Sequence, residues 1–138
     1  MVKKILVAYD GSDSAQRAFR FALELAAPFD ASLIVLSVAQ LPEPATMVES
    51  SAVLEAATEH FQKGIAELRA EASTAGVALD TRIVVGHPAD QIVHLAAEEH
   101  ADLIVMGHRG KSMIQRWLLG SVSKRVISYA PCSVLISR

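Results

Sequence analysis

The sequence predicts an α/β fold of the three-layer, doubly wound type, built on a five-stranded parallel sheet. Short runs rich in Val, Ile and Leu alternate along the chain with longer segments of helical periodicity. Most of these runs are continuously apolar, which is typical of strands buried on both faces of a parallel sheet. Because connections between parallel strands are right-handed, such an alternation winds helices onto both faces of the sheet.

The strands are expected where the apolar runs are shortest and richest in branched residues, at Ile5–Tyr9, Ser32–Val38, Ala78–Val85, Leu103–Met106 and Val134–Ile136. Four helices are expected between them, at Asp13–Ala27, from about Met47 to Ala75, from Pro88 onward, and at Ser121–Tyr129. Each carries apolar residues three or four positions apart, so one stripe can face the sheet.

Local signals support the helix ends. The segment Thr46-Met47-Val48-Glu49 has the form of a capping box that opens the second helix, and Gly76 is suited to end it. Pro88 favours the first position of the third helix, and Pro131 ends the fourth.

Composition restricts the class of protein. The chain has 138 residues, of which 51% are hydrophobic and 20% charged, so one domain with an aliphatic core is expected. A net charge of −2 argues against a nucleic-acid binder. The single cysteine, Cys132, excludes an internal disulfide. Without a leader pattern or an apolar run of about 20 residues, we expect a cytoplasmic protein with no membrane insertion.

The most informative motif follows the fourth predicted strand. Gly107-His108-Arg109-Gly110 is separated by nine residues from Gly120-Ser121. Glycine allows backbone N–H groups to approach an anion closely, and a helix beginning after Gly120 adds free N–H donors and a partial positive charge. The pattern therefore predicts a phosphate site, at which Ser121 and Ser123 can add hydroxyl groups.

This spacing resembles the G-x2-G-x9-G-S/T signature of the ATP-binding subgroup of the universal stress protein family. Three further segments are similar to that family, so the resemblance covers the whole chain: Ile5–Ser12, Leu118–Ser123 and Ala130–Ile136. One departure is Cys132-Ser133-Val134, where the family usually has Cys-Pro-Val. It falls on the last strand and leaves the phosphate motif intact.

The resemblance implies the strand order 3-2-1-4-5 and ATP, with or without Mg²⁺, as the ligand. In that order the winding reverses between strands 1 and 4, and ligands of open α/β sheets bind beside such a switch point. The cofactor-binding residues expected are Ala8, Tyr9, Asp10, Val38, Met106, Gly107, His108, Arg109, Gly110, Gly120, Ser121, Val122 and Ser123.

By resemblance, Asp10 holds the ribose or the adjoining sugar–phosphate, while Ala8 and Val38 line the adenine pocket. From the residues alone, Asp10 can equally be a cap of the first helix. Arg109 and Lys111 either neutralise phosphate or are solvated. The apolar group around Trp117 is either packing beneath the phosphate loop or a partner surface.

Other classes of function fit less well. The Walker A tail Gly110-Lys111-Ser112 lacks its first glycine, because Val105 stands there. A response-regulator receiver needs an aspartate after strand 3, where the chain has Val85-Gly86-His87-Pro88. We therefore expect an ATP-binding stress-response or regulatory module. The alternative is a slow ATP hydrolase or phosphotransferase that uses the same site, and no catalytic or metal-ligating residue is assigned.

The last strand predicts the assembly. An exposed apolar edge strand is a liability unless it is paired. By resemblance, a homodimer forms through Ser133–Ile136, and Ser133 supplies an N–H where proline would not.

Overall fold

The computed structural model describes residues 1–40, 47–108 and 120–138, with side chains in the second helix described from Ser51 onward. The elements follow one another as β1 (Lys4–Ala8), α1 (Asp13–Phe29), β2 (Ser32–Ala39), α2 (Met47–Ala75), β3 (Leu79–Val85), α3 (Pro88–Glu98), β4 (Leu103–Gly107), α4 (Ser121–Tyr129) and β5 (Ser133–Ser137).

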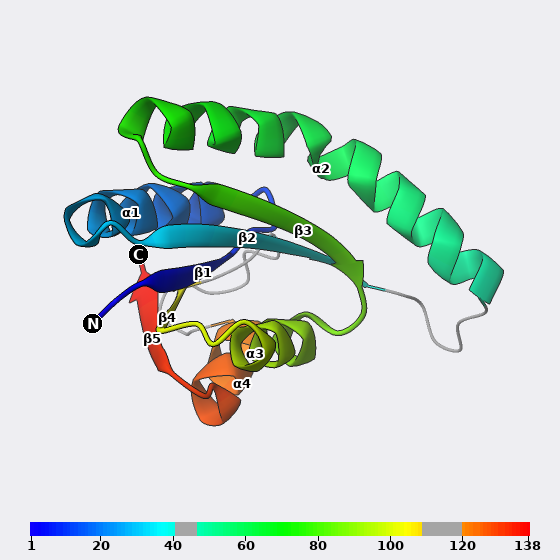
Figure 1. The fold of residues 1–138 in the computed structure, drawn as a ribbon. Helices are drawn as coiled ribbons and strands as arrows, with labels where there is room; N and C mark the ends of the chain where they lie inside the picture. Colours follow the sequence, from blue (N-terminus) through cyan, green and yellow to red (C-terminus); the bar gives the residue numbers. More distant parts are fainter. Residues whose placement is uncertain (41–46, 109–119) are drawn as a thin grey trace.

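The sheet confirms the predicted class and strand order. Its five strands are parallel and lie in the order β3-β2-β1-β4-β5. Helices α1 and α2 cover one face and α3 and α4 the other, which gives three layers (Figure 1). The N-terminal part of α2 extends beyond the end of β3.

Strand ends agree with the sequence to within one or two residues, and α1 runs two residues past the expected Ala27. Pro28 is accommodated in its last turn, and Asp30 closes the helix in the left-handed region at φ 53°. The amides of Asp30 and Ala31 donate to Ala27 and Ala26. The predicted ends at Gly76, Pro88 and Tyr129 are confirmed, whereas Thr46 of the predicted capping box lies outside the described residues.

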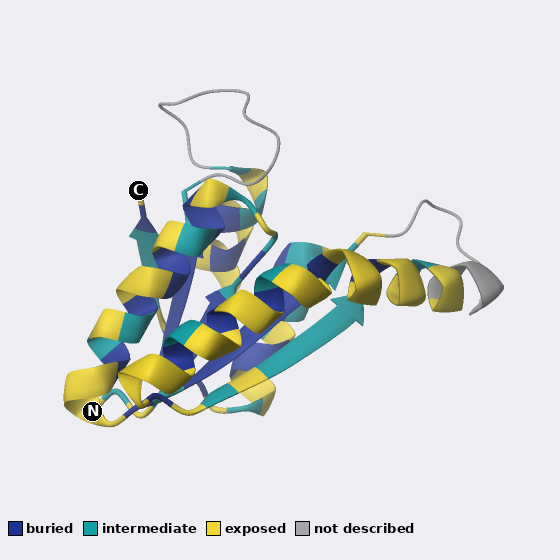
Figure 2. Cartoon of the chain, turned by 90° about the horizontal axis from the view of Figure 1, so that it is seen from above, coloured by how far each residue is buried: buried dark blue, intermediate teal, exposed yellow. Residues whose placement is uncertain are grey.

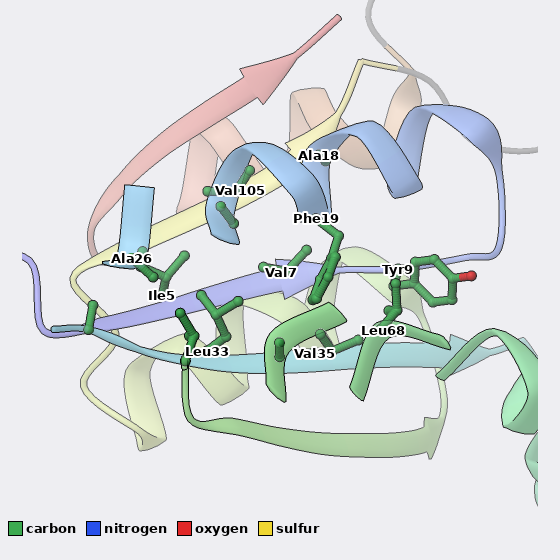
Figure 3. Close-up of a cluster of buried hydrophobic side chains, with 14 of the residues drawn as sticks. Ile5, Val7, Tyr9, Ala18, Phe19, Ala26, Leu33, Val35, Leu68 and Val105 are labelled. Atoms are coloured by element: carbon green, nitrogen blue, oxygen red, sulfur yellow. The ribbon is translucent and has the colours of Figure 1, made fainter. Parts of the chain in front are cut away.

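Side chains of β1 alternate between the two halves of the core. Ile5, Val7 and Tyr9 point toward α1 and α2, and Leu6 and Ala8 point toward α3 and α4. Figure 3 shows the first set around Phe19 of α1, which is fully buried. Alanines form most of the inner face of α1, so the helix approaches the sheet closely. The outer faces of α1 and α2 are exposed (Figure 2).

Gly64 lies in the middle of α2 because of Tyr9. A β-carbon on Gly64 would lie 2.6 Å from the Tyr9 hydroxyl oxygen and 3.4 Å from its Cζ. Tyr9 is only 4% exposed, so its ring has little freedom to move aside. The glycine costs helix propensity but allows α2 to cross above this ring.

Toward the N-terminal ends of the strands, ion pairs link charged side chains of β1 and β3 to Glu99, which follows α3. The Arg82 guanidinium lies 2.7 Å from one oxygen of Glu99 and 3.1 Å from Asp80, and the Lys4 ammonium lies 3.4 Å from the second Glu99 oxygen. These hydrogen bonds, first from Arg82 and then from Lys4, lower the pKa of the Glu99 carboxyl. The pKa of Arg82 is raised in turn, chiefly by its hydrogen bond to Glu99.

Asp102 joins the beginnings of β1 and β4. Its Oδ2 accepts hydrogen bonds from the amides of Lys3 and Lys4 at 2.8 and 3.0 Å. These two amides lower the pKa of the Asp102 carboxyl. The Asp102 amide donates to the Lys4 carbonyl at 2.9 Å, so the contact runs in both directions.

Candidate functional site

The sequence-predicted loops leave the sheet side by side. Strands β1 and β4 are neighbours, with Val7 opposite Val105, so the chain after Ala8 and the chain after Gly107 emerge at the same edge. The winding reverses here, because β1 is followed by β2 on one side and β4 by β5 on the other. This is the position at which open α/β sheets bind ligands.

A short hydrogen-bonded turn carries Asp10 into α1. Ser12 is the N-cap, and its Oγ accepts the Ala15 amide at 3.1 Å. Asp10 Oδ1 accepts the Ser12 amide at 2.9 Å. Asp10 therefore holds the capping residue in place and is not itself the cap. The carboxylate is half-buried at the sheet edge, where it can meet a ligand.

Ser37, which the sequence analysis did not single out, fixes the exit of β1. Its Oγ donates to the Tyr9 carbonyl at 2.8 Å, and the side chain is completely buried. The Tyr9 amide donates to the Leu36 carbonyl at 2.9 Å. The only sequence signal was one hydroxyl within the apolar run of β2. Its bond sets where the segment leading to Asp10 begins.

Two hydrogen bonds join the end of β4 to the start of α4, and a third joins it to β5. The Gly120 amide donates to the His108 carbonyl at 2.9 Å, and the Ser123 hydroxyl donates to the Gly107 carbonyl at 3.1 Å. The His108 amide donates to the Ser137 carbonyl of β5 at 3.0 Å. Two parts of the predicted motif, Gly107-His108 and Gly120-Ser121, are thereby brought together although they are distant in sequence.

The N-terminus of α4 has donors to offer. Gly120 is the N-cap in extended geometry and makes no side-chain cap bond. The amides of Ser121 and Val122, in the first turn of α4, have no carbonyl partner within the helix. That turn contains no acidic side chain, whereas the first turn of α1 contains Asp13. Negative charge is therefore better accommodated at α4 than at α1.

Gly107 is enclosed by the first turns of both helices. On the side opposite Ser123, a β-carbon on Gly107 would lie 2.2 Å from Ser14 Oγ and 3.0 Å from the Ser14 carbonyl carbon. Within the described part of the chain, Ser14 Oγ and His108 Nδ1 are the buried side-chain polar atoms that have no hydrogen-bond partner. Both belong to residues at or against the end of β4.

The predicted apolar site residues share one face of the sheet. Ala8, Val38, Met106 and Val122 all belong to the cluster between the sheet and the helices α3 and α4. The Tyr9 side chain belongs to the cluster on the opposite face, under α1 and α2. Only the main chain of Tyr9 can therefore contribute to a site on the α3 and α4 side. The structure therefore brings an apolar surface and the α4 amides to the same side.

Arg109, Gly110, Lys111 and Trp117, on which further predictions rest, lie outside the described residues. Among the residues that are described, no group of three or more His, Cys, Asp or Glu could hold a metal ion. Burial raises the pKa of the half-buried Cys132 thiol, which is not the environment of a nucleophile. No helix in the described part of the chain is long and apolar enough to cross a membrane.

This order of strands, with its switch point between β1 and β4, defines a doubly wound α/β protein. The sequence profile of the universal stress protein family matches residues 1–138, and the chain belongs to that family.

Individual relatives agree. A universal stress protein from Thermus aquaticus is 40% identical over 140 residues, which cover 100% of both chains. The universal stress protein UspA from Lactobacillus plantarum superposes with a TM-score of 0.89 at 31% identity, covering 99% of this chain and 97% of that one. A universal stress protein solved in complex with cAMP has a TM-score of 0.75 at 34% identity, with 99% and 97% coverage.

Proposed function

We propose that the chain binds an adenine nucleotide, ATP in the first instance, at the C-terminal ends of β1 and β4, and acts as a nucleotide-dependent stress-response or regulatory module. The observation that carries this proposal is the start of α4. Its first-turn amides have no carbonyl partner within the helix, the turn holds no acidic side chain, and it lies beside Gly107 at the point where the winding reverses. A phosphate group accepts hydrogen bonds from such amides.

The apolar face supports the choice of an adenine nucleotide. Ala8, Val38 and Met106 give a planar base a surface on the α4 side of the sheet, and Asp10 lies next to them at the end of β1. A relative of the same architecture is complexed with cAMP, which contains the same base and a phosphate. Mg²⁺ is assigned no ligands from the described residues and would accompany the phosphates.

A charge placed in the first turn of α4 tests this proposal. Ser121 is exposed, so Ser121→Asp should leave the fold intact and can even favour the helix. Its carboxylate would repel phosphate, and we expect the affinity for ATP, measured by calorimetry, to fall at least about tenfold. Ser128→Asp, at the exposed end of the same helix, is the matched control and should bind as the wild type does. Equal affinity of the Ser121→Asp variant, or no ATP binding by the wild type, would refute the proposal.

The hydrolase alternative is tested with the same protein. A hydrolase needs a group that orients water and one that supports the metal. Asp10 is a carboxylate at the end of β1, beside the apolar face, and its Oδ1 is already bonded to the Ser12 amide. We therefore expect phosphate release far slower than about 1 s⁻¹. Sustained turnover at that rate would favour the enzyme.

We also propose that two copies associate along β5. This strand is outermost in the sheet, and the two helices beside it expose apolar side chains on the same flank. On α1, Phe21 and Phe29 are 47% and 43% exposed and lie in one stripe with Leu25. Arg20, which pairs with Glu71 of α2, faces the other flank. On α4, Ile127 is 47% exposed, on the flank opposite the Arg125 that pairs with Asp90 of α3.

A second copy fits this surface by symmetry. Antiparallel pairing of two β5 strands about a two-fold axis brings α1 of each subunit alongside the other. With Phe21 near the axis, Arg17 of one subunit faces Glu24 of the partner subunit, and the reverse contact forms as well. Both side chains are exposed in the single chain.

A further inference from the structure

The side chain of Gln91, near the start of α3, covers a glycine at the end of β3. A β-carbon on Gly86 would lie 2.8 Å from Gln91 Nε2 and 3.2 Å from its Cγ. A larger residue at position 86 would therefore displace the carboxamide from this place. The backbone N–H of Gln91 donates to the His87 carbonyl at 3.0 Å, so the main chain of Gln91 is fixed in the first turn of the helix.

This position adjoins the proposed base surface. The Gly86 amide donates at 2.9 Å to the carbonyl of Ala39, the residue that follows Val38. Val38 is paired with Val84, and both belong to the cluster under α3 and α4. Neighbouring strands are about 4.8 Å apart, so the carboxamide is roughly one strand spacing from the end of β2 on the ligand side of the sheet.

Gln91 is half-buried, and among the described residues its side-chain oxygen and nitrogen have no hydrogen-bonding partner. A half-buried amide beside the end of β2, with no partner among the described residues, is suited to recognise a complementary group on a ligand.

We propose that the Gln91 carboxamide selects the base of the bound nucleotide, adenine in preference to guanine; the inference rests on the proposed nucleotide site. Adenine presents an amino donor next to a ring-nitrogen acceptor, which an amide can pair with two hydrogen bonds. On the same edge, which carries N7, guanine presents two acceptors, N7 and O6. The amide oxygen would then have no donor to meet. Gln91 is thus a specificity-determining residue, distinct from the phosphate donors of α4.

The test compares ATP and GTP on the intact protein. Gln91→Leu keeps the size of the side chain and removes both polar atoms. We expect it to lower the affinity for ATP by at least about fivefold, the lower range for a bidentate amide–adenine pair, and to leave GTP within twofold of the wild type. The control is Gln62→Leu, which makes the same change at an exposed position of α2 and should leave both affinities unchanged.

Two results would overturn the inference while leaving the nucleotide site in place. One is ATP binding by Gln91→Leu with the wild-type preference for ATP over GTP. The other is an equal loss of ATP and GTP affinity, which would indicate a structural role of the side chain. Failure of the wild-type protein to bind either nucleotide is a different result, which would refute the proposed function and this inference with it.

Discussion

The hydroxyl of Ser14 fills the space in which a β-carbon of residue 107 would lie. The two positions are 2.2 Å apart, and Ser14 Oγ has no hydrogen-bond partner within the described residues. The first turn of α1 thus packs closely against the end of β4. Because an unpaired buried hydroxyl is costly, this packing lowers the stability of the fold.

Substitutions at these two positions should act in opposite directions. Ser14→Ala removes the unpaired hydroxyl and should raise the free energy of unfolding by about 1 kcal/mol. Gly107→Ala should lower it by about 1–3 kcal/mol, because the added carbon overlaps Ser14. Urea denaturation of both single variants and the double variant measures the coupling. Only partial rescue is expected in the double variant, since the Ser14 carbonyl carbon would still lie 3.0 Å away. Additive effects would show that the two residues do not interact.

The effect of Gly64→Ala on the free energy of unfolding should change sign with the residue at position 9. In the wild-type protein the new carbon meets the Tyr9 hydroxyl at 2.6 Å, and a loss of about 1–3 kcal/mol is expected. Tyr9→Phe removes that oxygen, so in its background the same substitution should stabilise α2 by up to about 1 kcal/mol, the difference in helix propensity. Thermal unfolding of the four proteins tests this. Destabilisation of equal size in both backgrounds would exclude the contact as its cause.

Acid should weaken the fold through Glu99 and Asp102. Both carboxyl groups have a pKa below their ordinary values of 4.5 and 3.8. The unfolded chain therefore takes up these protons first as the pH falls. The stability that they contribute is fully present above about pH 5 and is lost as the pH falls through the folded-state values.

The corresponding neutral variants provide the measurement. Glu99→Gln and Asp102→Asn should each lower the unfolding temperature at pH 7 and reduce its further decline between pH 5 and pH 3. Exposed Glu67 of α2, for which no partner among the described residues is found, serves as a control in the form Glu67→Gln. A decline with pH that is as steep in the variants as in the wild type would show that other groups govern acid unfolding.

The proposed dimer should respond to charge at the α1 flank. Phe21→Lys places two like charges near the two-fold axis and should raise the dissociation constant at least about tenfold in sedimentation experiments. Leu54→Lys on α2, where the side chain is 40% exposed, is the matched control. Arg17→Glu should also weaken association, and adding Glu24→Arg should restore it. A monomeric wild type at micromolar concentration would contradict the assembly.

Much of the fold could be predicted because each strand and helix is locally consistent with it. The runs such as Leu103–Met106 are too short and too rich in branched residues for helices, and Gly76 and Pro88 stand where the backbone requires them. The family also agrees with the motif. The extension of α1 through Pro28 was missed, because a proline usually marks a helix boundary. Here the helix closes only after it, where the amides of Asp30 and Ala31 donate to Ala27 and Ala26.

The site was predicted less completely, since its polar contacts depend on tertiary neighbours. Gly107, Gly120 and Asp10 are visible through spacing and resemblance. Ser37 and Ser14 are not, because a hydroxyl in a strand or a first helical turn has no sequence pattern that names its partner. Gln91 becomes informative only once Gly86 is seen beneath it. The role expected of Ser123 toward phosphate stays a prediction, and its hydroxyl proton is shared with Gly107.

The main chain of His108 links the start of α4 to strand β5. Its amide donates to the Ser137 carbonyl of β5, the outermost strand. Its carbonyl accepts the amide of Gly120, the N-cap of α4. The residue next to the start of α4, where we propose that the nucleotide binds, thus also bonds to β5, along which we propose that a second copy attaches. Under these two proposals, nucleotide binding and dimer formation would be coupled through the main chain of one residue.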